Sequence, residues 1–465
     1  MTELHIVVLA AGKGTRMKSA VSKVVHPLAG LPLIEHVIRT TTDLQVDTTT
    51  VVVGHGAEDV RTALGGHPQV GFVVQAPQLG TGHALLQAEP LLAGHRGTLL
   101  LLYGDVPLLT TNTLRQLLDR HRSRRATLTV LTTELADPYG YGRIIRNDTG
   151  QITRIVEERD ASGDERAIRE VNSGIYALEL GSLFDDLRSL ASDNSQGEYY
   201  LTDLVSAYHR RGHGVETLRI DDPAELRGVN TRVDLADLGR VLLDRTRRAL
   251  MLQGVTLEDP STTFIDADVT IGEDTIIAPG VTISGRTTIG ARCRVRSGTR
   301  ITDSVVGDDV TILDHSIIVQ STVADGAAIG PMAHLRPGSD VGRGAHVGTF
   351  VELKKTTLGP GSKANHLAYL GDTVIGANVN IGAGVITCNY DGVSKHQTTI
   401  EDGVFVGSDS QLVAPVTIGS GAYVAAGSSI TQDVPPGALG VARSHQTNKD
   451  GWAARRAARH KEKAP

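Results

Sequence analysis

The sequence has few cysteines and no excess of positive charge, and each shortage excludes a class of protein. Its 465 residues include 2 cysteines, Cys293 and Cys388, too few for a disulfide framework or a four-cysteine zinc site. Its 46 basic residues are outnumbered by 52 acidic ones, which gives a net charge of −6. Such a chain has no global positive field to hold nucleic acid or an anionic membrane. We therefore expect neither partner.

Long hydrophobic runs are also missing. No apolar stretch approaches the roughly 18 residues needed to cross a bilayer. The first residues, MTELHIVVLAAG, have no basic cluster before their short apolar run and so do not resemble a signal peptide. With so few cysteines, these features predict a cytoplasmic protein.

The length predicts two or three domains, since an ordinary domain has about 150 residues. Up to residue 228, aliphatic strands such as IVVLA, TVVVG, FVVQA, LLLLYG and ATLTVLT alternate with helical stretches such as 111–124. This order is typical of an α/β domain with a mostly parallel sheet. Residues 229–253 follow, with leucines at helical spacing until Gly254, and are expected to form a connecting helix.

From residue 254 to residue 442, aliphatic residues recur at every sixth position, often followed by glycine. They are Ile271, Ile277, Ile283, Ile289, Val295, Ile301, Val306, Ile312, Ile318, Val323, Ile329, Leu335, Val341, Val347, Ile400, Val406, Leu412, Ile418, Val424 and Ile430. The repeat slips by one residue before Val306 and resumes at Val323 and again at Ile400. Hexapeptide repetition is typical of a parallel β-helix with three hexads, about 18 residues, in each coil. The alternative, a β-sandwich, would need a period of two.

A tail of residues 443–465 completes the chain. After Arg443, its charged residues are Lys449, Asp450, Arg455, Arg456, Arg459, Lys461, Glu462 and Lys463. The excess of positive charge is compatible with a solvated tail and equally with a contact to phosphate or to a partner chain.

A glycine-rich loop, LAAGKGTRM at residues 9–17, follows the first expected strand. It matches neither the dinucleotide fingerprint, because Met17 replaces the third glycine, nor a P-loop. Its exposed backbone amides, with Lys13, Arg16 and Lys23 beside them, suit a triphosphate. Asp105 follows the LLLLY strand, and the carboxyl ends of such strands are where α/β sheets bind ligands. The alternative for Asp105 is an ordinary helix cap.

The glycine-rich loop followed by a lysine resembles the sugar-phosphate nucleotidyltransferases. Further segments are similar to the bacterial bifunctional N-acetylglucosamine-1-phosphate uridyltransferase / glucosamine-1-phosphate acetyltransferase family over essentially the whole chain. These segments are QAPQLGTGHA at 75–84, YGDVP at 103–107, YGR at 141–143, VEERD at 156–160, VNSGIY at 171–176 and GVN at 228–230. One departure is Ser22, where the family usually has proline before the lysine.

The resemblance implies a Rossmann-like nucleotidyltransferase domain and the residues of its site. The nucleotide would be held by Leu9, Ala10, Ala11, Gly12 and Lys23, its uracil by Gln75, Gly80 and Thr81, with Tyr103, Gly104 and Asp105 beside them. Asp105 and Asn230 would bind one or two Mg²⁺ ions, and Gly142, Glu157 and Asn172 the sugar phosphate. We assign Arg16 and Lys23 the catalytic task of neutralising the phosphates of UTP.

The hexads break at 351–374 and 383–399, where a solenoid usually carries binding residues. By resemblance, His366 in the first break is the general base of an acetyltransferase. The glucosamine phosphate would be bound by Arg336, Lys354, Tyr369 and Asn380, and acetyl-CoA by Ala383, Asn389, Tyr390, Ser408, Ala426 and Arg443.

The cysteine and histidine residues of the β-helix raise two rival chemistries. Cys388 has no histidine adjacent to it in TCNYDG, so a buried inert thiol is expected rather than an acyl-carrying nucleophile. A zinc-dependent hydratase would use His315, His334, His346 and His366. Their spacing does not stack them on one face, so zinc ligation is not expected within one chain, and sites between subunits stay open.

The expected protein is therefore a two-site enzyme of UDP-N-acetylglucosamine synthesis, a step of peptidoglycan and cell-wall biogenesis. It would acetylate glucosamine 1-phosphate with acetyl-CoA and then transfer uridylyl from UTP to N-acetylglucosamine 1-phosphate. The resemblance also implies a left-handed β-helix and a homotrimer joined through it. The main alternative keeps the nucleotidyltransferase and makes the β-helix a non-catalytic oligomerisation module; a non-enzymatic scaffold ranks last.

Overall fold

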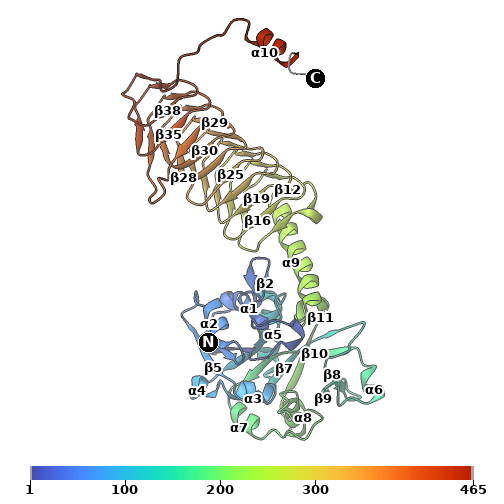
Figure 1. The fold of residues 1–465 in the computed structure, drawn as a ribbon. Coiled ribbons are helices and arrows are strands. Elements are labelled where there is room, and N and C mark those ends of the chain that lie inside the picture. Colours follow the sequence, from blue (N-terminus) through green and yellow to red (C-terminus); the bar gives the residue numbers. More distant parts are fainter. Residues whose placement is uncertain (1–2, 462–465) are drawn as a thin grey trace. The chain divides into compact units, whose positions relative to one another are not determined.

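The computed structural model describes residues 3–461 and divides the chain into two compact units, Met1–Thr246 and Arg247–Pro465. The division lies inside helix α9, Arg232–Leu252 (Figure 1). None of the described helices is long and apolar enough to cross a membrane. The expected boundaries at 228, 253 and 442 stay predictions.

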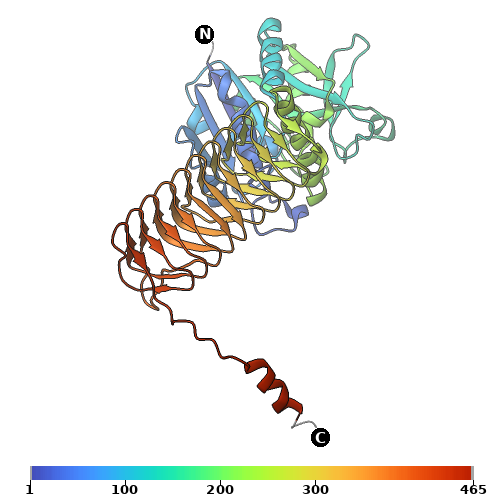
Figure 2. The ribbon, with the colours of Figure 1, turned by 90° about the horizontal axis from the view of Figure 1, so that it is seen from above.

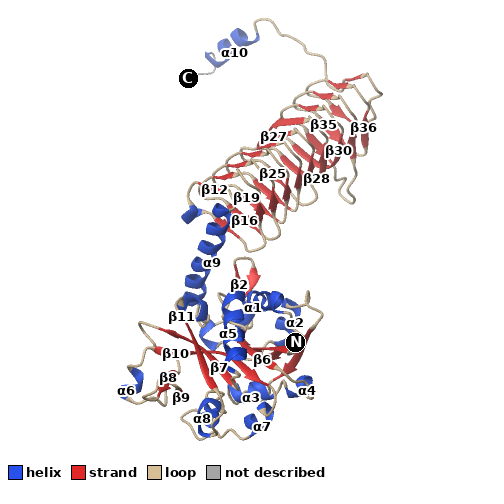
Figure 3. Ribbon diagram, turned by 180° about the vertical axis from the view of Figure 1, so that it is seen from behind, coloured by secondary structure: helices blue, strands red, loops and turns tan. Residues whose placement is uncertain are grey.

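The first unit is built on a mostly parallel sheet, as predicted (Figure 3). Its strand order is β11-β7-β10-β6-β1-β4-β5. The strands are β1 Leu4–Ala10, β4 Thr48–Val53, β5 Val70–Val74, β6 Thr98–Tyr103, β7 Leu128–Glu134, β10 Glu170–Glu179 and β11 Val215–Ile220. Strand β10 alone in this order runs antiparallel to its neighbours, and it also pairs with the hairpin of β8, Arg143–Arg146, and β9, Ile152–Val156.

Both faces of this sheet are covered, which explains why its central strands are continuous apolar runs. On β1, Ile6 and Val8 pack into one hydrophobic cluster, and Val7 and Leu9 pack into the other. The helices of the unit are α1 Leu33–Thr41, α2 Ala57–Ala63, α3 Thr81–Leu86, α4 Glu89–Leu92, α5 Thr111–Arg124, α6 Gly163–Arg166, α7 Leu183–Arg188 and α8 Asp203–Arg210. The predicted helix over 111–124 is confirmed, and the Thr110 side chain caps it by accepting a hydrogen bond from the Thr113 amide.

The ends of β1 and β6 determine where ligands can bind. The two strands pair in parallel, with Leu9 opposite Tyr103. The segments Ala11–Gly12 and Gly104–Asp105 therefore leave the sheet side by side at its carboxyl edge. The chain after β1 continues into two short 3-10 turns, Thr15–Met17 and Lys23–Val25.

The second unit is a left-handed parallel β-helix (Figure 2). Its short strands run from β12, Thr256–Leu257, to β39, Leu439–Gly440, and form sheets of 11 and 17 strands. Paired strands are about one coil apart in the sequence, as in Ile283 opposite Ile301. Every aliphatic residue of the predicted six-residue repeat is buried, so the inward direction of these side chains is confirmed.

The coils stack so closely that some positions accept only glycine. A Cβ atom on Gly407 would lie 2.5 Å from the backbone nitrogen of Ala426 in the next coil, which is closer than carbon and nitrogen can approach. Where the repeat breaks, the strands lengthen: β28 spans Glu352–Leu358 and β30 spans Tyr369–Ile375. A loop closed by a bridge between Tyr390 and Lys395 follows.

We predict that Ile301→Ala destabilises the β-helix by about 2–5 kcal/mol, because it removes a fully buried side chain and leaves a cavity between coils. Arg300→Ala, on the same strand but exposed, should change the free energy of unfolding by less than about 0.5 kcal/mol. Urea unfolding of both variants checks this. Equal effects of the two substitutions would contradict the inward packing of the repeat.

Candidate functional site

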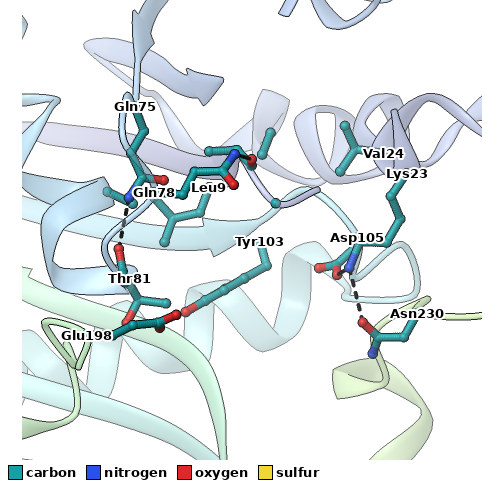
Figure 4. A pocket seen from close by; sticks show the side chains of 15 residues that line it. Leu9, Lys23, Val24, Gln75, Gln78, Thr81, Tyr103, Asp105, Glu198 and Asn230 are labelled. Atoms are coloured by element: carbon teal, nitrogen blue, oxygen red, sulfur yellow. Dashed lines mark hydrogen bonds and ion pairs between the residues drawn. The ribbon is translucent and has the colours of Figure 1, made fainter. Parts of the chain in front are cut away.

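A pocket of about 420 Å³ lies at the carboxyl edge of the sheet (Figure 4). Most of the residues expected to bind the nucleotide line it. They are Leu9, Ala10, Ala11, Gly12, Lys23, Gln75, Gly80, Thr81, Tyr103, Asp105 and Asn230. The pocket therefore brings together loops that are up to 221 positions apart in the sequence, from Leu9 to Asn230.

Four further lining residues were not singled out from the sequence: Val24, Gln78, Ala84 and Glu198. Gln78 and Ala84 belong to the QAPQLGTGHA segment, and the side-chain amide of Gln78 donates to the carbonyl of Ala11. Motif matching marked that segment without showing which of its side chains turn inward. Glu198 lies in a loop without a motif, so the sequence contained no signal for it.

The charged centre of the pocket is an ion pair between Lys23 and Asp105, each with 14% of its side chain exposed. The Lys23 ammonium also donates to the side-chain oxygen of Asn230 over 3.2 Å, and Arg16 donates to the same oxygen over 2.8 Å. The amide of Val229 donates to the carbonyl of Asp105 over 2.9 Å, which holds the Asn230 loop against the end of β6. Two cations, a carboxylate and an amide thus converge at one point.

The glycine loop is shaped around this centre. A Cβ atom on Gly14, whose φ is +59°, would lie 2.8 Å from the Cβ of Lys23. At the opposite end of the pocket, the Gln75 amide donates to the carbonyl of Gly80 over 3.0 Å. Gly80 has a φ of +106°, and a Cβ atom there would lie 2.7 Å from the Tyr199 carbonyl oxygen. Both turns therefore require glycine.

The residues expected to bind the sugar phosphate are next to the pocket rather than in its lining. Asn172 donates its backbone N–H to the Gly142 carbonyl over 2.8 Å, and Glu157 accepts from the Thr202 hydroxyl over 3.1 Å. Burial raises the pKa of the Tyr103 phenol, and the carboxylates of Glu157 and Asp105 raise it further. Tyr103 therefore lies between the charged centre and the Glu157 carboxylate.

A second group of polar residues lies on the β-helix, on β28 and β30. Lys354 donates to Asp372 over 2.8 Å, and Asn389 donates to the same carboxylate. This bond to Asp372 raises the pKa of Lys354. The pKa of Asp372 is lowered, because its hydrogen bonds from Lys354 and Asn389 outweigh the effect of burial. The nearby Lys354 ammonium lowers the pKa of Lys395.

The other expected acceptor residues lie close to this group in the coil stack. Arg336 donates to Glu352 over 2.8 Å, and Glu352 is opposite Tyr369 on the next coil. Asn380 lies on another sheet, where it pairs with Lys363 of β29, Lys363–His366. His366, the expected base, is exposed at the end of β29 opposite Thr349. Within the described part of one chain, no hydrogen bond or ion pair joins His366 to the Lys354 group.

The residues expected to bind acetyl-CoA follow successive coils. The amide of Asp409 donates to Ala383 over 2.7 Å, and the amide of Gly427 donates to Ser408 over 2.9 Å. These bonds place Ala383, Ser408 and Ala426 in one line along the coil stack. Arg443 continues beyond it, since a Cβ atom on Gly427 would lie 3.8 Å from the Cδ of Arg443. Asn389 is buried, and Tyr390 is exposed.

The expectation that the Cys388 thiol is buried is wrong. Cys388 is half-buried rather than buried, because it lies at the end of β32, Ile386–Cys388, where the loop at Tyr390 leaves the coil. Over the described residues, the groupings of three or more potential metal ligands do not include His315, His334, His346 or His366.

The tail contains a helix, α10, Trp452–Lys461. The Arg456 guanidinium lies 5.2 Å from the centre of the Trp452 ring. Lys449, Asp450, Arg455 and Arg459 are exposed. The side chain of Lys461, and Glu462 and Lys463 as a whole, lie outside the described residues.

Comparisons with known proteins cover almost the whole chain. Family models match residues 6–195 (MobA-like NTP transferase domain), 261–339 (GMPPB C-terminal domain) and 397–432 (bacterial transferase hexapeptide, six repeats). Curated relatives carry the name "Bifunctional protein GlmU". That of Geotalea uraniireducens is 50% identical over 97% of this chain and 99% of its own. Those of Shouchella clausii and Pelobacter propionicus are 49% and 50% identical, over 97% and 98% of this chain and 99% of their own.

The half-buried Glu157 gives a prediction for the dependence of stability on pH. Burial raises its pKa above the ordinary value of 4.5, so the folded state binds the proton more tightly than the unfolded state. The stability that this gives is present below pH 4.5 and is lost as the pH rises through the folded-state pKa. Glu157→Gln, which stays neutral, should therefore match the wild type at pH 4 and have the higher Tm at pH 8.

The neighbouring Glu158 is the control, because its pKa is shifted in the opposite direction. Its hydrogen bond from Arg143, over 2.7 Å, lowers its pKa, so it contributes stability above pH 4.5 that is lost on acidification. Glu158→Gln should have the lower Tm at pH 8. Scanning calorimetry at both pH values measures both variants, and a Tm of Glu157→Gln below wild type at pH 8 would contradict a raised pKa of the Glu157 carboxyl.

Proposed function

The chain belongs to the family of bifunctional GlmU proteins, and we propose that its two units catalyse successive steps of UDP-N-acetylglucosamine synthesis. The β-helix transfers acetyl from acetyl-CoA to glucosamine 1-phosphate. The α/β unit then transfers uridylyl from UTP to N-acetylglucosamine 1-phosphate and releases pyrophosphate. The observation that carries the proposal is the pocket that joins the glycine-rich loop to Lys23, Asp105 and Asn230.

The charged centre supplies what uridylyl transfer requires. A phosphate oxygen of the sugar attacks the α-phosphorus of UTP, and the bond from that phosphorus to the bridging oxygen of pyrophosphate breaks. Positioning and neutralisation of charge are the main catalytic demands of phosphoryl chemistry. Arg16 and Lys23 are bound to Asn230, and they would exchange these contacts for the phosphate oxygens of UTP.

The oxygen atoms at this centre fit Mg²⁺. Asp105 and Asn230 offer a carboxylate and an amide oxygen that both contact Lys23, so a positive charge already lies between them. Mg²⁺ prefers oxygen ligands and needs only one or two protein groups beside substrate phosphates. Bound there, Mg²⁺ would neutralise negative charge on the phosphates. This metal requirement and a cytoplasmic location are parts of the proposal.

Acetyl transfer is assigned to the β-helix residues around Lys354 and His366. The substrate amine attacks the thioester carbonyl, His366 takes the amine proton, and the carbon–sulfur bond breaks to release coenzyme A, whose thiolate takes up a proton. Imidazole is the side chain that enzymes use most often as a general base, and His366 is exposed, so its ring is accessible to the substrate. Arg336 and Lys354, each bound to a carboxylate, would turn to the substrate phosphate.

This site is better completed by a second chain than by one chain alone. His366 and Asn380 lie on the 11-stranded sheet, and Lys354 and Tyr369 lie on the 17-stranded sheet. The proposed homotrimer would bring His366 of one chain to the Lys354 group of its neighbour. The second candidate function keeps uridylyl transfer and leaves the β-helix to oligomerisation, and His366 separates the two.

We expect His366→Ala to lower kcat for acetyl transfer by about 10²–10⁴-fold, the usual contribution of a general base, with uridylyl transfer unchanged. His315→Ala, at another exposed β-helix histidine, is the control and should leave both activities intact. Thiol release from acetyl-CoA and pyrophosphate release from UTP measure the two reactions. Normal acetyl transfer by the His366 variant would remove this assignment.

Asp105→Asn should lower kcat/KM for uridylyl transfer by at least about 100-fold, because it removes the carboxylate charge on which the Lys23 position depends. Acetyl transfer should keep its wild-type rate. Asp119→Asn makes the same chemical change at an exposed position of α5 and should affect neither reaction. Pyrophosphate release with Mg²⁺ and N-acetylglucosamine 1-phosphate measures the effect; a loss of less than tenfold would argue against a catalytic Asp105.

A further inference from the structure

Three potential metal ligands meet at the sheet edge opposite the uridyltransferase pocket. Glu3 immediately precedes β1, His5 is the second residue of β1, and His95 lies in the turn between α4 and β6. The pocket residues follow the carboxyl ends of the same two strands, whereas these three lie at their amino ends. The group therefore has no part in the proposed transfer reactions.

The three side chains are spaced as ligands of one ion would be. A Glu3 carboxylate oxygen lies 3.3 Å from Nε2 of His5 and 3.6 Å from Nδ1 of His95. One ligand atom from each residue lies within 4.8 Å of the other two. A tetrahedral zinc ion with ligands at about 2.0–2.2 Å separates them by about 3.3 Å. Small side-chain rotations would therefore bring the three ligand atoms to coordination distance from one ion.

His5 is held in the orientation that such a ligand needs. Its side chain is 0% exposed, and its Nδ1 lies 2.8 Å from the Thr48 hydroxyl on the neighbouring strand β4. Its Nε2 lies 3.3 Å from the Glu3 carboxylate and 3.2 Å from the Arg96 carbonyl. Both oxygens are acceptors, so Nε2 carries a proton in the ion-free chain. An ion would displace that proton, and a proton on Nδ1 would then be donated to Thr48. Histidine ligands of metals usually donate their other N–H to an oxygen in this way.

The other two ligands are positioned and open to solvent. The Glu3 carboxylate accepts a hydrogen bond from the Arg96 amide over 3.2 Å. The rings of His5 and His95 lie 4.8 Å apart, centre to centre. Half of the Glu3 side chain and 39% of the His95 side chain are exposed, so an ion can enter and water can complete its coordination.

We propose that Glu3, His5 and His95 form a binding site for a zinc-type divalent ion. Two imidazoles and one carboxylate are ligands that Zn²⁺ favours, whereas Mg²⁺ and Ca²⁺ prefer all-oxygen sets. The ion joins the start of β1 to the turn before β6. Since it binds the folded chain, it stabilises the α/β unit by mass action, and it does so away from the catalytic pocket.

The test uses the full-length protein after chelator treatment. Isothermal titration with ZnCl₂ in excess MgCl₂, which occupies oxygen-rich sites, should show one equivalent bound per chain. His95→Gln and Glu3→Gln remove exposed ligands, and each should weaken zinc binding at least tenfold. His67→Gln is the matched control, because His67 pairs with the single carboxylate of Glu35 over 2.9 Å, and it should bind as the wild type does.

Thermal unfolding gives an independent readout. Zinc should raise the Tm of the wild type and of His67→Gln but not that of His95→Gln. Equal Tm values of the three proteins in chelator would show that the substitutions leave the fold intact. The proposal is overturned if the wild type binds no zinc, or if both ligand variants bind it as tightly as the wild type.

Discussion

The ion pair between Lys23 and Asp105 is the interaction on which the uridyltransferase pocket depends. It joins the loop after β1 to the end of β6, and Asn230 is bound to the same ammonium group. Removing two charges from water costs free energy that their mutual attraction does not reliably return. A largely buried pair that lines a pocket of about 420 Å³ is therefore better explained by ligand binding than by stability.

The β-helix brings residues that are distant in the sequence together by stacking its coils. Its coils repeat with nearly constant length, so residues about one coil apart stack in lines, as Ala383 and Ser408 do across a longer insertion. The irregular segments interrupt these lines. Within them, Asp372 accepts hydrogen bonds from Lys354 and Asn389.

Local patterns made most of the fold predictable. The six-residue repeat identified buried residues such as Ile301 because one inward side chain per hexad is a property of the backbone path. The position of Asp105 in the pocket was predictable because it follows a strand of the sheet, and α/β sheets bind ligands at the carboxyl ends of their strands. Glu198 and the meeting of Glu3 with His95 were not predictable, since contacts between distant loops have no local signal. The antiparallel direction of β10 was not predictable for the same reason. The partial exposure of Cys388 was not predictable either, because a loop interrupts its coil.

The central claim is that one chain carries two transfer activities, and an assay of both on the purified wild-type protein tests it most directly. Thiol release would be followed with acetyl-CoA and glucosamine 1-phosphate. Pyrophosphate release would be followed with UTP, N-acetylglucosamine 1-phosphate and Mg²⁺. The account predicts both signals from a single preparation. Pyrophosphate without thiol would contradict it and leave the β-helix as a non-catalytic module.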